Sequence, residues 1–175
     1  GVFAEYVYKA TGKRTRIYLA DRGGIDPILP YVTLGLIEVV AIEDADVWIF
    51  TNRAAKGYIR DANRKWVLDK AKNSEIGLYA FESAHSIAKL MKLDIERKAA
   101  MGINIGGDTN TTFEVAGDGE KLKIGTTKGY QKYSIPQSRI AEEIMESQKL
   151  DAAYVLWTAG ASKEEDDVNT SKVVG

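Results

Sequence analysis

Runs of apolar and β-branched residues alternate with helical patterns along the first half of the chain. Two β-rich runs, at residues 2–8 and 14–19, predict a hairpin around the turn at residues 9–13. The Asp-Pro pair at residues 26–27 is typical of a helix start, with an N-cap residue followed by proline. Residues 36–42 are largely β-branched and fit either a continuation of that helix or a buried strand.

The middle of the chain predicts a β-α-β-α-β unit, which implies parallel strands joined by crossover helices. The wholly apolar run at residues 47–50 is typical of a strand buried on both faces. Apolar residues at helical spacing then predict an amphipathic helix over residues 53–72. A strand at residues 75–81, a helix that Ser83 caps and a strand that ends near Ile105 complete the unit.

The C-terminal third adds a hairpin, a helix, a strand and a tail. They are predicted, in that order, at residues 112–116 with 121–125, 136–150, 153–157 and 161–175. The tail holds four consecutive acidic residues and no apolar periodicity, which indicates a flexible acidic segment. We therefore expect one α/β domain over residues 1–160, with a mixed sheet, the central β-α-β-α-β unit and flanking β-hairpins.

Composition and charge exclude several classes of function. The 175 residues include no cysteine and one histidine, which rules out disulfides, thiol catalysis, zinc–thiolate sites and multi-histidine metal sites. Basic and acidic residues nearly balance, 24 against 25, so no global field favours nucleic acid, and self-association is compatible with the charge. No apolar run approaches a membrane span, so we expect a soluble domain and favour a cytoplasmic location. Abundant Lys and Glu with few Asn and Gln fit a thermostable protein.

Residues 102–112 are the segment best suited to bind phosphate. Glycines let backbone N–H groups converge on an anion and threonines add donors, which indicates Gly106, Gly107, Thr109 and Thr111 as ligands. An ordinary tight turn is the alternative. The strand, turn and hairpin resemble the phosphate-binding hairpin of sugar-kinase and actin-like ATPases, which implies nucleotide binding. Asn104 stands where that family keeps a metal-linked aspartate, and Asp108 separates Gly107 from Thr109.

A second resemblance covers the N-terminal half of the chain. Its order of hairpin, helix, strand, helix and strand, followed by residues 85–91, is similar to the core of Mrr-type restriction endonucleases. Those nucleases hold magnesium with an acidic residue on one strand and an acid-x-Lys motif on the next. Residues 17–22 contain no such motif, and Glu5 is the only nearby carboxylate on the first predicted strand. This resemblance implies a degenerate nuclease-like domain, and neither resemblance places the chain in a family.

Basic and aromatic side chains are interleaved between residues 121 and 133. Such a mixture suits single-stranded nucleic acid, because bases stack on rings and phosphates pair with cations. The predicted nucleic-acid ligands are Lys121, Lys123, Lys128, Tyr130, Lys132 and Tyr133. The alternative is a hairpin edge that lysines protect from pairing with other strands.

The remaining polar residues predict no catalytic and no metal site. Two groups of carboxylates are expected on solvated turns and helix faces: Glu43, Asp44 and Asp46, then Glu142, Glu143 and Glu146. His85 lies in the first turn of a predicted helix, has no nucleophile-elbow motif around it and is expected at or near the surface. The three tryptophans are expected as core anchors, with an interface role as the alternative: Trp48, Trp66 and Trp157.

Together these patterns favour a non-enzymatic binding or assembly domain that acts through a protein interface, with a protein partner or a homo-oligomer. The reasons are the lack of an intact catalytic motif and of a strong charge field. They leave catalysis undecided and indicate no particular cofactor. The first alternative is a phosphate- or nucleotide-binding protein that uses residues 102–112. The second is the degenerate nuclease-like domain, with nucleic acid as a less favoured partner.

Overall fold

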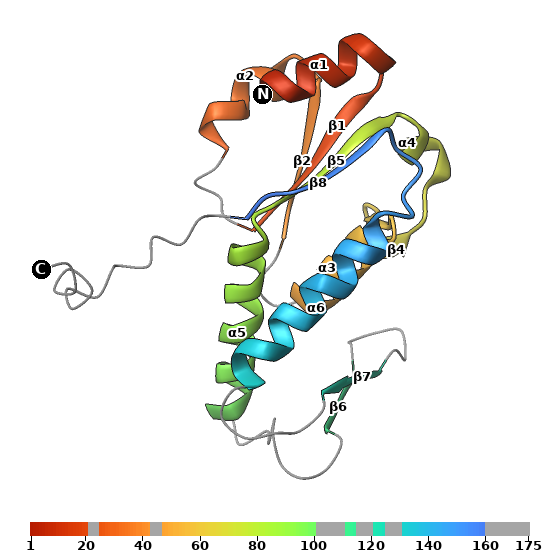
Figure 1. Cartoon of the computed structure of the whole chain (residues 1–175). Helices are drawn as coiled ribbons and strands as arrows, with labels where there is room; N and C mark the ends of the chain where they lie inside the picture. Colours follow the sequence, from red (N-terminus) through yellow and green to blue (C-terminus); the bar gives the residue numbers. More distant parts are fainter. Residues whose placement is uncertain (21–24, 43–46, 101–110, 115–120, 125–130, 160–175) are drawn as a thin grey trace, which may run out of the picture.

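Four parallel strands form the central sheet of the computed structural model of the chain (Figure 1). The structure describes residues 1–20, 25–42, 47–100, 111–114, 121–124 and 131–159. In spatial order the strands are β2 (Ile37–Ala41), β1 (Arg14–Leu19), β5 (Ile76–Glu82) and β8 (Tyr154–Trp157). Neighbouring strands all run parallel, and the register aligns Ile17 with Ala80 and Ala80 with Leu156.

Helices cover both faces of this sheet (Figure 1). One face carries two helices, the second of them preceded by a 3-10 turn: α1 (Val2–Thr11), η2 (Asp26–Ile28) and α2 (Leu29–Thr33). The other face carries three helices that pack against one another: α3 (Val47–Ala55), α5 (Ala84–Ala100) and α6 (Gln131–Ser147). The short helix α4 (Lys70–Ser74) leads directly into β5.

Two small antiparallel ribbons lie outside the central sheet. They pair β3 (Ile59–Arg60) with β4 (Trp66–Val67), and β6 (Thr111–Glu114) with β7 (Lys121–Ile124). The second ribbon confirms the hairpin expected at residues 112–116 and 121–125, and β8 confirms the strand expected at residues 153–157. The strand expected before Ile105 and the tail at residues 161–175 lie outside the described residues.

The predicted α/β class and single domain are confirmed, and so is the hairpin on the C-terminal side. A β-α-β-α-β unit also occurs, but at other residues than predicted. The unit consists of β1, α2, β2, α3 and β5, and therefore begins at Arg14 instead of near residue 47. Among the described strands, antiparallel pairing occurs only in the two ribbons, so the sheet itself is parallel throughout.

The N-terminal segment is a helix, so the strand and hairpin predicted from residues 2–8 are wrong. Ala4 and Val7 are buried three residues apart, which matches one face of a helix against the sheet. Gly12 ends α1 in the left-handed conformation (φ 69°), and its N–H donates to the carbonyl oxygen of Tyr8 at 2.7 Å. Since α1 occupies this segment, β1 pairs with β2 and β5 instead of with an N-terminal strand.

The segment between residues 47 and 72 also differs from its prediction. Residues 47–50 form the start of α3 and not a strand, because a helix buried on nearly every side shows the same apolar run as a buried strand. The helix expected over residues 53–72 is wrong as well. The chain leaves α3 at Ala55, turns through Gly57 (φ 80°) and enters the β3–β4 ribbon.

The remaining elements agree more closely with the sequence pattern. The ambiguous residues 36–42 contain the strand β2, which follows the turn at Gly35 (φ 72°). Ser83 caps α5 as expected, because its Oγ accepts a hydrogen bond from the Ser86 N–H at 3.2 Å. Helix α6 begins before the expected Pro136, which lies inside the helix.

A row of stacked aromatic rings connects three strands of the sheet. Tyr18, Phe81 and Trp157 are register partners on β1, β5 and β8, on the face that α3, α5 and α6 cover. The ring centroids of Tyr18 and Phe81 are 4.8 Å apart, and those of Phe81 and Trp157 are 4.2 Å apart. All three tryptophans of the chain contact this core, as expected.

Gly77 of β5 allows α1 to approach the sheet closely. A Cβ at this position would lie 2.9 Å from Thr11 Oγ1 and 3.0 Å from Val7 Cγ1. We predict that Gly77→Ala lowers the free energy of unfolding by about 1–3 kcal/mol, because α1 has to move outward. Urea denaturation measures this change, and a wild-type stability for Gly77→Ala would contradict the placement of α1.

Candidate functional site

The two ligand sites predicted from the sequence fall largely outside the described residues. Five of their members lie in the ranges 101–110 and 125–130: Gly106, Gly107, Thr109, Lys128 and Tyr130. The others belong to described elements: Thr111 to β6, Lys121 and Lys123 to β7, and Lys132 and Tyr133 to α6. The phosphate site and the nucleic-acid site both stay predictions.

One of the carboxylates expected at the surface is buried. Glu43, Asp44 and Asp46 lie outside the described residues. On α6, Glu142 is exposed, but Glu143 is only 1% exposed, so the expectation is wrong for this residue. Its position three residues after the buried Ile140 and four before the buried Ser147 places it on the helix face that packs inward. His85 is exposed, as expected.

Four side chains from α1 and β8 form an exposed apolar surface, called here the α1–β8 surface: Phe3, Tyr6, Tyr154 and Leu156. Their exposed fractions range from 41% for Tyr154 and Leu156 to 58% for Tyr6. Phe3 joins the two elements, because its ring centroid lies 6.2 Å from that of Tyr6 and 5.6 Å from that of Tyr154. Clustered apolar exposure of this kind marks protein interaction sites.

Strand β8 is also an edge of the sheet, and its only neighbour among the described strands is β5. Parallel strands bond a given neighbour through alternate residues. Just after β8, the Thr158 N–H donates to the Phe81 carbonyl oxygen of β5 at 3.1 Å, and the Thr158 carbonyl oxygen accepts from the Ala84 N–H at 2.7 Å. The backbone N–H and C=O groups of Tyr154 and Leu156 point toward β5, as those of Thr158 do. The N–H and C=O groups of Val155 and Trp157 therefore point away from β5. The edge therefore presents two pairs of backbone groups suited to another strand.

β8 lacks the features that protect edge strands from pairing. Such strands usually carry charged residues, proline or a bulge. The residues of β8 are all apolar or aromatic, and their register with β5 is regular. The opposite edge, β2, carries Glu38, whose carboxylate pairs with Arg16 Nε at 3.0 Å. The two edges of the sheet thus differ in protection, and β8 is the open one.

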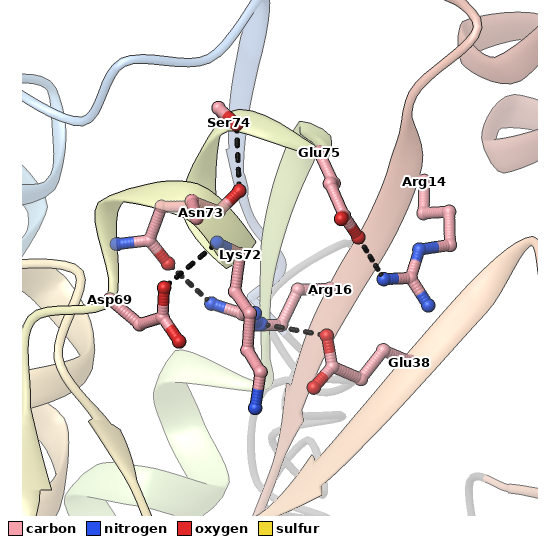
Figure 2. A network of polar contacts seen from close by, with 9 residues as sticks. Arg14, Arg16, Glu38, Asp69, Lys72, Asn73, Ser74 and Glu75 are labelled. Atoms are coloured by element: carbon pink, nitrogen blue, oxygen red, sulfur yellow. Dashed lines mark hydrogen bonds and ion pairs between the residues drawn. The ribbon is translucent and has the colours of Figure 1, made fainter.

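A buried arginine connects β1 to the edge strand β2 and to helix α4. Arg16 is 0% exposed; its Nε donates to Glu38 Oε2 at 3.0 Å and its Nη1 to Asn73 Oδ1 at 2.8 Å (Figure 2). Burial lowers the pKa of Arg16, but the nearby Tyr18 and Glu38 outweigh this effect and the net pKa is raised. The charged guanidinium thus holds β2 and α4 against β1, and we assign this network a structural role.

A pocket of about 290 Å³ opens near this network. Its lining includes Tyr8 of α1, Arg14 of β1 and Leu36 and Glu75, which precede β2 and β5. Arg14 Nη2 and Glu75 Oε2 lie 2.5 Å apart and are the only charged groups among the described residues of the lining, so their charges balance. The pocket therefore presents no net charge that would select a charged ligand.

Buried carboxylates connect the three helices on the other face. Glu143 Oε1 of α6 lies 2.7 Å from Arg139 Nε and accepts a hydrogen bond from Asn52 Nδ2 of α3 at 3.0 Å. Burial raises the pKa of Glu143 above its ordinary value of 4.5, although Arg139 and Asn52 partly oppose this. In the same way, Asp94 of α5 accepts a hydrogen bond from Trp48 Nε1 of α3 at 2.9 Å.

Neither metal clusters nor membrane spans occur in the part of the chain that the structure describes: no three His, Asp or Glu side chains converge, and no helix is long and apolar enough to cross a bilayer. Comparisons of the chain with protein-family models, with curated proteins and with solved structures found no significant match. The α1–β8 surface is thus the described feature that suggests a function most directly.

The sequence predicts the strand of β8 but not the α1–β8 surface. With residues 2–8 predicted as a strand, Phe3 and Tyr6 fall on opposite faces, because side chains alternate along a strand. In the helix that forms instead, residues three apart share a face, and Phe3 and Tyr6 come together. The absence of charge from residues 153–157 was the available signal of an unprotected edge.

Asn73 tests the structural role of the Arg16 network. Its side chain accepts from Arg16 Nη1 and donates to the Gly57 carbonyl oxygen at 2.7 Å. We predict that Asn73→Ala lowers the free energy of unfolding by about 1–3 kcal/mol, because a buried donor loses its acceptor. The matched control is Asn63→Ala, at an exposed turn, which should change it by less than about 0.5 kcal/mol. Equal effects of the two substitutions in urea denaturation would refute this role.

The raised pKa of Glu143 gives a pH dependence with a definite sign. A carboxyl group whose pKa is higher in the folded state binds its proton more tightly there, so its ionisation weakens folding as pH rises above 4.5. We predict that the unfolding free energy of the wild type, minus that of Glu143→Gln, falls between about pH 4 and pH 7. Glu142→Gln, on the exposed face, is the control. A difference that rises with pH would contradict the burial of Glu143.

Proposed function

We propose that the chain is a non-enzymatic assembly domain, and that its α1–β8 surface binds a second copy of the same chain. One observation carries the proposal: an uncharged edge strand whose exposed side chains continue onto aromatic side chains of a neighbouring helix. Tyr and Phe are enriched in protein interfaces, where large rings bury area at little entropic cost. An open strand edge adds directional hydrogen bonds to that apolar contact.

Charge supports a second copy as the occupant. The net charge of −1 gives two copies little reason to repel one another. The four side chains of the α1–β8 surface carry no charge, so the surface offers no electrostatic selection for an acidic or a basic partner. A surface that is apolar on both sides of the contact is self-complementary, which is what a two-fold interface requires.

The protected edge β2 limits how assembly proceeds. If β8 of one copy paired with β2 of the next, the contact would repeat from copy to copy without closing. Glu38 on β2 opposes such pairing, because a partner strand would cover a charge that is now partly exposed. Pairing of β8 with β8 uses the same surface twice and closes after two copies, so a dimer is the expected assembly.

The ionic groups of the described core support a structural and non-catalytic interpretation. Each buried or half-buried charge described above has an oppositely charged or hydrogen-bonding partner, as in the pairs of Arg16 with Glu38, of Arg139 with Glu143 and of Asp94 with Trp48. Such partners stabilise the charged or hydrogen-bonded state and hold helices and strands in place. None of these groups faces the α1–β8 surface, whose chemistry is that of binding.

Leu156→Lys tests the proposal. Lysine at this edge position places a charge in the apolar contact of each copy, and we predict that it weakens dimerisation at least about tenfold. Size-exclusion chromatography with light scattering should give a dimer for the wild type at micromolar concentration and a monomer for Leu156→Lys.

The matched control is Met145→Lys, which changes a side chain that is 67% exposed on α6, a helix on the opposite face of the sheet from α1. It should remain a dimer, and far-ultraviolet circular dichroism should show that both variants are folded. A monomeric wild type, or a Leu156→Lys variant as dimeric as the wild type, would refute the proposal.

A further inference from the structure

We infer that the two copies pair their β8 strands antiparallel about a two-fold axis at Val155, so that two four-stranded sheets join into one continuous sheet. This inference rests on the proposed function and specifies how the α1–β8 surface binds a second copy. It commits to one register among those that an exposed edge allows. The argument uses the backbone orientation of β8, the side chains on its two faces and the symmetry of a dimer.

Symmetry fixes the direction of the pairing. When two identical strands meet edge to edge across a two-fold axis perpendicular to them, the axis reverses one strand relative to the other, so they run antiparallel. In an antiparallel ladder, alternate residues form hydrogen-bonded pairs through groups that point toward the partner strand. Val155 and Trp157 carry the outward groups of β8, so they must supply these pairs.

Side chains select the register. With the axis at Val155, this residue lies opposite Val155 of the second copy in a hydrogen-bonded pair. Tyr154 of each copy then lies opposite Leu156 of the other copy. Both exposed side chains of β8 then cover one another, and this happens twice in the dimer. With the axis at Leu156, Tyr154 would face the polar Thr158 of the second copy, and the apolar match would be lost.

Helix α1 extends this contact on the same face. Phe3 already touches the ring of Tyr154, and Tyr6 lies beside Phe3 with near-parallel rings at 13°. In the inferred register, each Phe3 therefore lies next to a pair formed by Tyr154 and the Leu156 of the second copy. The opposite face of β8 is already occupied within one copy, because Trp157 stacks on Phe81. Strand pairing can proceed without displacing that stack.

Disulfide trapping tests the register, because the chain has no cysteine of its own. Directly opposed residues of a hydrogen-bonded antiparallel pair have Cα atoms about 5.5 Å apart, within the range of about 4.4–6.8 Å that a disulfide spans. We predict that Val155→Cys alone forms a covalent dimer under mild oxidation. Leu156→Cys alone should not, since two copies of residue 156 lie diagonally across the pair.

A mixing experiment adds an independent reading. Tyr154→Cys and Leu156→Cys should each stay monomeric on a denaturing non-reducing gel, and a covalent dimer should form only when the two variants are mixed. Met145→Cys, outside the surface, is the control for random collisions and should crosslink in neither case. Circular dichroism and light scattering of the reduced variants confirm that each is folded and dimeric before oxidation.

The outcomes separate the inference from the proposed function. Crosslinking of Val155→Cys together with the mixed pair supports the axis at Val155. Faster crosslinking of Leu156→Cys than of Val155→Cys would overturn the register in favour of an axis at Leu156. A wild-type dimer that none of these variants crosslinks would overturn the axis at Val155 and the axis at Leu156, while leaving the α1–β8 surface as the interface. A monomeric wild type would overturn the proposed function itself.

Discussion

Stacking of Trp157 on Phe81 fixes the position of β8 and, with it, the character of the molecular surface. The two rings lie 4.2 Å apart at an interplanar angle of 6°, and Trp157 Nε1 also donates to the buried Ser147 Oγ at 3.0 Å. These contacts hold the side chain of Trp157 on the helical face of the sheet. Since side chains alternate along a strand, Tyr154 and Leu156 must then lie on the other face, beside α1. The exposed apolar surface is thus a consequence of how the core is packed.

The polar groups inside the molecule explain why the two edges of the sheet differ. Arg16 is buried, and leaving its charge without a partner would be costly, so Glu38 of β2 is held beside it. The same carboxylate makes β2 a poor site for another strand. Strand β8 has no such requirement, because its core contacts are aromatic. Its outward backbone groups have no strand partner among the described residues, which leaves this edge available for the self-association that we propose.

The α/β class, the strands β5 and β8, the β6–β7 hairpin and the start of α5 could be predicted because turn residues and caps set them off from their neighbours. Two segments could not. Residues 47–50 are apolar throughout, and burial on all sides removes the periodicity that separates a helix from a strand. Residues 2–8 contain Ala4 and Val7 at helical spacing among aromatic residues that also favour strands. Only tertiary packing decides such cases, and the α1–β8 surface depends on one of them, so it could not be predicted.

Amide hydrogen exchange along β8, measured as a function of protein concentration, tests the account most directly. The N–H groups of Val155 and Trp157 point away from β5, so they should exchange rapidly in dilute protein and slowly once copies pair. The N–H of Leu156 bonds toward β5 and should be protected at every concentration, which makes it the internal reference. Exchange at Val155 and Trp157 that does not change with concentration would contradict pairing through β8.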